Sequence, residues 1–231
     1  MLIIGLVFHC MNNNDHSLGN SLHELDDDVF EQHLSVSCYG DFELTDAIRP
    51  SYSLDVRPLE GFDYRTYHDK KTHITSPIII ASASREKLWD LFMDLIEITG
   101  DEVDVVLEAS HNCMAGHIDI HREGIDLPVL QSILIDHEEL MLNDGNTGIA
   151  VLNPEKPTEV QFDDHKLLYI YGVGLDVAAE ILNSRKVFYR KNMRFITQAE
   201  HIHLSSEEFE QQFHTLKQAL GMEDSDSYDG Y

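Results

Sequence analysis

The chain has 231 residues, of which 42 are acidic and 16 are basic, so its formal net charge is -26. A field of that sign repels nucleic acid and anionic membrane surfaces, and it favours a basic partner or bound cations. Hydrophobic residues make up 42% of the chain and charged residues 25%, which excludes wholesale disorder and indicates a folded protein.

The three cysteines, Cys10, Cys38 and Cys113, are few and widely spaced, without a CxxC pair. This usage excludes a disulfide framework and predicts a cytoplasmic protein. The apolar stretch at residues 1–11 is shorter than the roughly 20 residues that a membrane-spanning helix needs. We therefore expect no membrane partner.

Composition changes at both ends of the chain divide it into three parts. Residues 12–20 are rich in asparagine, so we expect residues 1–20 to form a weakly ordered amino terminus. Residues 222–231 carry acids, serine and glycine with little apolar content, which predicts an acidic, disordered tail. Between them, residues 21–221 are expected to form one domain.

The clearest structural unit covers residues 76–110. An apolar run at 78–81 predicts a strand, and Ser82 or Ser84 can cap a following helix. Apolar residues then recur at helical spacing through 88–96, and alternate as a strand through 103–109. Strand, helix and strand together form a βαβ crossover if the two strands are parallel.

Similar ingredients recur later in the chain. A strand at 117–120 precedes a helical pattern at 127–142, and two strands at 159–162 and 167–171 flank a polar turn. The final helix is predicted to begin with a capping box formed by Ser205 and Glu208. The pattern predicts an α+β (or α/β) fold: a mixed β-sheet with helices packed against it and a loose strand–strand–helix repetition.

The densest chemical signal is the segment His117-Ile118-Asp119-Ile120-His121. In an extended strand the two isoleucines lie on one face and the three polar side chains on the other. An ordinary amphipathic strand with one solvated face therefore explains the alternation without any ligand.

A metal site is the competing hypothesis for the same segment. Side chains two positions apart on a strand lie about 6.6 Å apart, so one ion can take His117 with Asp119, or Asp119 with His121. The remaining ligands would come from His201 and His203, which alternate in the same way before the final helix. Two such strand-borne pairs meeting across a sheet would suit zinc or iron.

Two fainter signals each have an ordinary structural explanation. Cys113 lies near His111 and could be an activated nucleophile, but no recognised nucleophile motif surrounds it, so a structural thiol is the favoured explanation. Gly172 and Gly174 stand between a strand and a helix, as in a phosphate-binding loop. Val177 occupies the position of the third glycine of that motif, so we expect a simple turn.

Five of the sixteen basic residues gather in ten positions, and no acid occurs between Glu180 and Glu200. Aromatic residues between basic ones can bind nucleic acid, but the strong negative charge of the rest of the chain opposes this. We expect this segment to contact acidic protein surface instead, and partly to stabilise the end of the preceding helix. The five residues are Arg185, Lys186, Arg190, Lys191 and Arg194.

These observations leave two hypotheses about function. The first is an acidic, non-catalytic binding or regulatory domain without a cofactor, whose partner is a basic protein or a second copy of the chain. The alternative is a metal-dependent hydrolase that uses the 117–121 and 201–203 segments with zinc or iron. The sequence favours the non-enzymatic hypothesis, because short His-x-Asp and His-x-His patterns carry little specificity.

Overall fold

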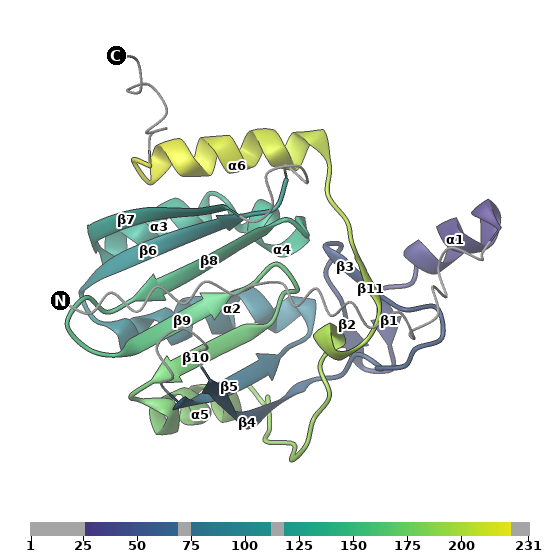
Figure 1. The fold of residues 1–231 in the computed structure, drawn as a ribbon, viewed down its shortest axis with the longest axis horizontal. Helices are drawn as coiled ribbons and strands as arrows, with labels where there is room; N and C mark the ends of the chain where they lie inside the picture. The colour runs from purple at the N-terminus through teal and green to yellow at the C-terminus, as the bar shows by residue number, and fades with distance from the viewer. Residues whose placement is uncertain (1–25, 69–74, 112–117, 223–231) are drawn as a thin grey trace.

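The computed structural model describes residues 26–68, 75–111 and 118–222. A seven-stranded sheet is the central element of this part of the chain (Figure 1). The strands lie in the order β4-β5-β10-β9-β8-β6-β7, and every neighbouring pair is antiparallel. With helices packed on this sheet, the α+β fold class expected from the sequence is confirmed. The strands are β4 (Gly61–His68), β5 (Thr75–Ser82), β6 (Glu102–Ala109), β7 (Ile118–Asp126), β8 (Thr147–Leu152), β9 (Thr158–Phe162) and β10 (Leu168–Gly172).

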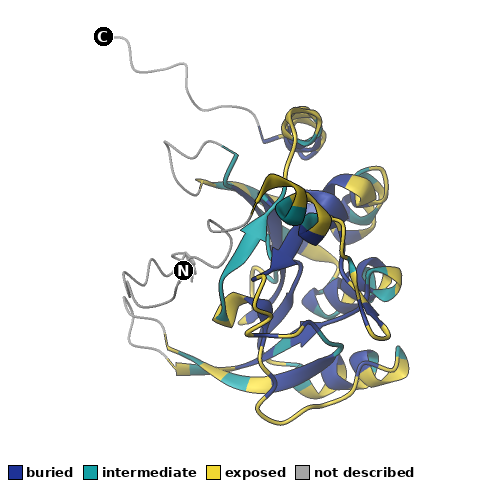
Figure 2. Cartoon of the chain, turned by 90° about the vertical axis from the view of Figure 1, so that its right-hand side faces the viewer, coloured by how far each residue is buried: buried dark blue, intermediate teal, exposed yellow. Residues whose placement is uncertain are grey.

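Most of the helices pack on one side of the sheet, with buried faces toward it and exposed faces outward (Figure 2). The exception is α1 (Asp27–Leu34), which lies beyond one end of the large sheet (Figure 1). Four antiparallel steps separate β5 from β6, so these two strands run in the same direction without being neighbours. The predicted strand–helix–strand unit is therefore a crossover that spans β10, β9 and β8. The helices are α1 (Asp27–Leu34), α2 (Arg85–Ile96), α3 (Leu127–Ile135), α4 (Glu138–Asn143), α5 (Leu175–Ser184) and α6 (Glu207–Ala219).

The main core lies between α2 and the centre of the sheet. Helical spacing places Leu88, Leu95 and Phe92 on the buried face of α2, and each is at most 1% exposed. The ring of Phe92 stacks on that of Phe162 in β9 with centroids 5.3 Å apart. Ser84 occupies the N-cap position, one of the two predicted caps. The helical period of residues 88–96 thus gave both the helix and the face that it buries.

Polar side chains occupy the opposite face of the central strands. Side chains alternate along β9, so Glu159 and Gln161 point away from the helices, and both are buried. The amide of Gln161 donates to both carboxylate oxygens of Glu108 at 2.8 and 3.0 Å. The hydroxyl of Tyr171 lies 3.5 Å from the Gln161 carbonyl oxygen. The sheet is thus apolar on one face and carries a buried polar network on the other.

Two small sheets lie at one end of the large one. Strands β1 (Cys38–Tyr39) and β2 (Phe42–Glu43) form one, and β3 (Ile48–Pro50) and β11 (His201–His203) form the other. Short 3-10 helices, η1 (Glu97–Thr99) and η2 (Ile196–Gln198), complete the described chain. The β3–β11 pair joins segments about 150 positions apart in the sequence. Both strands of this pair lie beside one end of the large sheet (Figure 1).

The last helix begins one residue later than the sequence predicted. Ser206, not Ser205, is the N-cap of α6, and its hydroxyl accepts a hydrogen bond from the Phe209 amide at 3.3 Å. Ser205 instead contacts the carboxylate of Asp144, which the local pattern could not reveal. Met222, beyond the helix, is buried in the main core. Within the described ranges, no helix is long and apolar enough to cross a membrane.

Candidate metal centre

A tight turn between β9 and β10 presents His165, and the hairpin expected around residues 163–166 is confirmed. The amide of Lys166 donates to the carbonyl oxygen of Asp163 at 3.1 Å, and the amide of Leu167 donates to the Asp163 carboxylate at 2.8 Å. Lys166 adopts a left-handed conformation with φ 60°, which reverses the chain direction. These bonds fix the backbone on both sides of His165.

Strand β11 presents the two other histidines of this centre. His201 and His203 are two positions apart, so their side chains lie on the same face of the strand. Pairing with β3 holds the strand, and the Leu204 amide extends the pairing by donating to the carbonyl oxygen of Ala47 at 2.8 Å. The strand-like alternation seen in the sequence is therefore present at these residues.

The three rings converge although they come from two separate segments. The centroids of His165 and His203 lie 4.6 Å apart, those of His165 and His201 4.9 Å, and those of His201 and His203 5.2 Å. One ring nitrogen from each lies within 4.8 Å of the others. Nitrogen ligands of a tetrahedral zinc ion stand about 3.3 Å apart, so the three nitrogens of this three-histidine cluster would move closer together on binding an ion.

Hydrogen bonds at the Nδ1 atoms orient all three rings. Nδ1 of His201 lies 2.7 Å from the carbonyl oxygen of Ala199, and Nδ1 of His203 bonds to that of Gly145. Nδ1 of His165 lies 3.0 Å from the carboxylate of Asp163 and 2.7 Å from that of Asp164. A carbonyl or carboxylate acceptor at one nitrogen is the usual arrangement around metal-binding histidines, and it would make Nε2 the candidate ligand atom of each ring.

The three histidines have divergent pKa values. Burial alone would lower the pKa of His165, but the carboxylates of Asp163 and Asp164 raise it to about 10. Burial and the nearby charge of His165 lower the pKa of His201 to about 4, and burial lowers that of His203. Without an ion, the cluster therefore carries one protonated and two neutral rings at neutral pH.

A second polar group adjoins the cluster through the loop before β8. The carboxylate of Asp144 is fully buried, accepts a hydrogen bond from the Thr147 hydroxyl, and lies 2.8 Å from Nε2 of His111. Burial alone would raise the pKa of Asp144, but contacts with His111, Ser205 and Thr147 lower it. Gly145, which accepts the bond from His203, follows Asp144 directly, so the loop links the two groups.

Lys166 supplies a buried positive charge beside these carboxylates. Its ammonium group donates to the carbonyl oxygen of Thr147 at 2.8 Å. Burial lowers the pKa of Lys166 to about 8, although Asp144, Asp164 and Asp163 oppose the shift. Because the acids outnumber the cations here, the surroundings of the three-histidine cluster favour additional positive charge.

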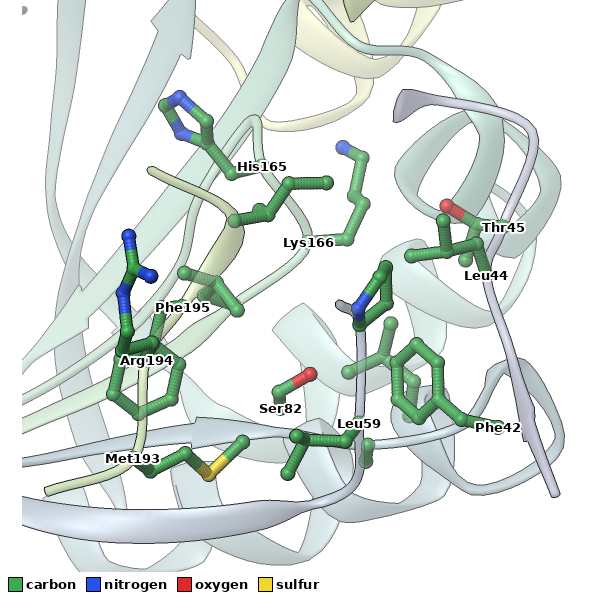
Figure 3. Close-up of a pocket in the computed structure, with 15 residues that line it drawn as sticks. Phe42, Leu44, Thr45, Leu59, Ser82, His165, Lys166, Met193, Arg194 and Phe195 are labelled. Atoms are coloured by element: carbon green, nitrogen blue, oxygen red, sulfur yellow. The ribbon is translucent and has the colours of Figure 1, made fainter. Parts of the chain in front are cut away.

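A small cavity of about 20 Å³ lies beside the turn (Figure 3). Its wall is mostly apolar and includes Leu59, Met193 and Phe195, while His165 and Lys166 form part of its polar border. A space of this size holds a water molecule or a few ligand atoms.

The structure brings together only some of the metal ligands that the sequence predicted. His201 and His203 belong to the three-histidine cluster, whereas His117 lies outside the described residues. Asp119 and His121 lie on β7, and neither belongs to a group of described residues that could share an ion. Cys113 also lies outside the described residues.

Sequence reasoning missed His165 as a ligand. The segment Asp163-Asp164-His165-Lys166 was correctly interpreted as a turn, and its polar residues needed no further explanation. One feature of the sequence could have identified His165 as a candidate ligand. It directly follows two acids, and a carboxylate can accept the Nδ1 hydrogen of such a histidine.

The basic segment is largely engaged within the chain. Arg185 follows α5 and pairs with Asp94 at 2.6 Å and with Asp90 at 3.2 Å on α2. Arg190 donates to the carbonyl oxygen of Glu60 at 2.7 Å, and Arg194 donates to the carbonyl oxygen of Asp55 at 3.0 Å. Lys186 and Lys191 are exposed.

The Gly172–Gly174 segment forms a turn at the start of α5. A Cβ atom at Gly172 would lie 1.5 Å from the carbonyl oxygen of Pro157, and both glycines have positive φ. The need for glycine therefore comes from the chain itself, as the turn interpretation expected.

Comparison with known proteins did not assign a family. No family model matches the chain, and no curated protein or solved structure matches it.

Proposed function

We propose that this protein is a binding domain that holds a zinc ion in the three-histidine cluster of His165, His201 and His203. The observation that carries the proposal is the orientation of the rings. Each Nδ1 atom has a carbonyl or carboxylate acceptor, while ring nitrogens of all three lie within 4.8 Å of one another. An acceptor bonded to one ring nitrogen fixes the tautomer and raises the basicity of the other nitrogen, which can then coordinate the ion.

Charge supports a cation at this position. The carboxylates of Asp144, Asp163 and Asp164 lie around the cluster, and Lys166 is their buried counter-ion. A divalent ion would displace the proton from His165 and leave the local charge closer to neutral. The chain's formal charge of -26 adds a long-range attraction for cations.

The ligand chemistry favours zinc over iron. Three imidazole ligands form known zinc sites, whereas non-haem iron sites commonly combine two histidines with a carboxylate. The carboxylates of Asp163 and Asp164 are here occupied with Nδ1 of His165. Zinc is therefore the metal we propose, with iron as the ion to be compared.

A structural role fits the placement of the ligands. His165 lies in the β9–β10 turn of the large sheet, and His201 and His203 belong to the small β3–β11 sheet. An ion bound to all three would tie the two sheets together, which suits a non-catalytic binding or regulatory domain.

Metal-dependent hydrolysis is the second candidate. Catalytic zinc sites keep three protein ligands and an open fourth position for water, and three histidines satisfy that requirement. The cavity bordered by His165 and Lys166 would admit only a small group (Figure 3).

Metal analysis tests the proposal directly. We expect the protein to bind zinc at one ion per chain, and His165→Ala, His201→Ala and His203→Ala each to weaken binding about 10- to 100-fold or more. His121→Ala, at an exposed position on β7, is the control and should bind like the wild type. Absence of stoichiometric zinc binding, or equal binding by the three variants, would falsify the proposal.

Cobalt substitution separates the two roles. A cobalt-loaded site whose visible spectrum changes on addition of azide has an exchangeable fourth ligand, as hydrolysis requires. An unchanged spectrum supports the structural role.

The proposal also covers the partner and the cellular compartment of the protein. We propose a cytoplasmic protein that contacts a basic protein or a second copy of itself. The charge of the chain and the exposed free thiol of Cys38 support this.

A further inference from the structure

Strand β4 forms one edge of the seven-stranded sheet (Figure 1). Outside it, the amide of Phe62 donates to the carbonyl oxygen of Phe188 at 3.1 Å, and the amide of Arg190 donates to that of Phe62 at 2.8 Å. This pairing is an isolated parallel bridge, so within the described chain the added segment pairs with β4 only at Phe62.

The geometry of the strand leaves further backbone groups at this edge. Backbone groups two positions apart point to the same side of a strand, so those of Tyr64 and Thr66 point outward like those of Phe62. An outward-facing row of this kind is a template for pairing with another chain.

Exposed aromatic side chains flank the same edge. Phe188 is 58% exposed, Tyr189 49% and Tyr64 48%. The ring of Tyr64 lies 5.7 Å from that of Tyr189 and 5.8 Å from that of the buried Phe62, so the two exposed tyrosines form a contiguous surface that Phe62 supports. Contiguous exposed aromatic groups are typical of interaction sites.

The charge beside the aromatic surface is positive. Arg190 and Lys191 are exposed and follow Tyr189 directly, and no acid occurs between Glu180 and Glu200. A local positive surface favours a negatively charged ligand. On a chain with net charge -26, that ligand should be a short acidic segment, because a short segment can contact this surface alone. A long polyanion such as nucleic acid would also meet the repulsive field of the whole protein.

We propose that the β4 edge at Tyr64 and Thr66, with Tyr189 and Lys191, binds an extended acidic peptide segment of a partner protein by strand addition. The peptide backbone pairs with the outward groups of β4, its acidic side chains face Arg190 and Lys191, and an apolar side chain packs on the aromatic rings. This surface is separate from the three-histidine cluster and does not depend on a metal.

The experiment is selection from a library of random short peptides displayed on phage, with the intact wild-type protein as target. We expect selected peptides to be acidic and rich in β-branched or aromatic residues. Their affinity should fall about tenfold for Thr66→Pro, which removes an outward amide, and for Lys191→Glu. Thr66→Val keeps the amide, and Lys156→Glu makes the same charge change in another loop; both should bind within about twofold of the wild type.

Circular dichroism and thermal unfolding of each variant show whether it is folded, and proline is tolerated at edge positions whose amide faces solvent. Enrichment of no peptides, or of peptides without acidic bias, overturns the proposal. So does equal binding by Thr66→Pro and Thr66→Val. Binding of a single-stranded oligonucleotide that Lys191→Glu abolishes would assign the surface to nucleic acid and also overturn it.

Discussion

The ammonium group of Lys166 donates a hydrogen bond to the carbonyl oxygen of Thr147 at 2.8 Å, although Lys166 lies in the β9–β10 turn and Thr147 is the first residue of β8. The contact joins the β9–β10 turn to the segment that begins β8. It also places a buried cation among the carboxylates of Asp144, Asp163 and Asp164.

Replacing this cation should strongly destabilise the fold. Lys166→Met keeps a side chain of similar length but leaves the surrounding carboxylates without their buried counter-charge. We expect the free energy of unfolding to fall by about 3–5 kcal/mol, as for removal of one partner of a buried ion pair. Urea denaturation in the presence of a chelator measures the effect apart from metal binding. Lys191→Met, at an exposed position, is the control, and a loss at Lys166 no greater than at Lys191 would contradict the assigned role.

The two glycines before α5 offer a matched pair of substitutions. Both have positive φ, 83° at Gly172 and 88° at Gly174, so alanine is strained at either position by about 1–2 kcal/mol. At Gly172 the new Cβ would also collide with the Pro157 carbonyl oxygen, whereas at Gly174 nothing lies within 4 Å. We expect Gly172→Ala to cost about 2 kcal/mol more than Gly174→Ala, because overpacking adds to the strain. Similar melting temperatures for the two variants would show that the turn relaxes easily.

Local patterns predicted much of the fold. The helical spacing at 88–96 identified α2, and the polar turn at 163–166 identified the β9–β10 hairpin. These features depend on neighbouring residues, so periodicity and turn chemistry suffice. The strand order does not depend on neighbours: four pairings separate β5 from β6, and no local pattern encodes them.

The candidate site was predictable only in part for the same reason. The alternation at His201 and His203 is local and was visible, but their convergence with His165 depends on the pairing of β11 with β3. Asp119 and His121 carry the same alternation, yet they lie on an edge strand without a third described ligand. Alternation therefore identified strand faces, and tertiary structure decided which face gathers histidines.

Glu159 should make stability depend on pH. Burial and the nearby charge of Glu108 raise its pKa from 4.5 to about 8 in the folded protein. The folded state therefore binds the proton of Glu159 more tightly than the unfolded state does. The stability that this protonated carboxyl group contributes is complete below the unfolded pKa and is lost as pH rises through the folded pKa. Between pH 4.5 and about 8, this residue should lower the free energy of unfolding by about 1 kcal/mol per pH unit.

Comparison with Glu159→Gln isolates this effect. The stability of the wild type relative to this variant should decrease steadily with rising pH, as measured by urea denaturation at several pH values. Glu180→Gln, at an exposed position on α5, should leave the pH profile unchanged. A wild-type profile parallel to that of Glu159→Gln would show that the carboxyl group is already ionised when folded.

Zinc should stabilise the protein at the junction of the large sheet and the small β3–β11 sheet. Binding to the folded state alone raises the free energy of unfolding by about 2.7 kcal/mol when free zinc is 100 times its dissociation constant. Because His165 lies in the β9–β10 turn and His203 on the small β3–β11 sheet, an ion bound to both restrains the separation of these two segments. The amides of Gly145 and Leu204, which donate to the Leu204 and Ala47 carbonyl oxygens, lie at this junction.

Hydrogen exchange distinguishes this restraint from general stabilisation. With zinc, exchange at the Gly145 and Leu204 amides should slow more than exchange of amides at the far edge strand β4, and a chelator should reverse the change. His203→Ala should remove both the gain in stability and the added protection, since it eliminates the ligand on the small sheet. His121→Ala should retain both, because this side chain is exposed on β7. Stabilisation by zinc that persists in His203→Ala, or that leaves the junction amides unprotected, would place the ion at another site.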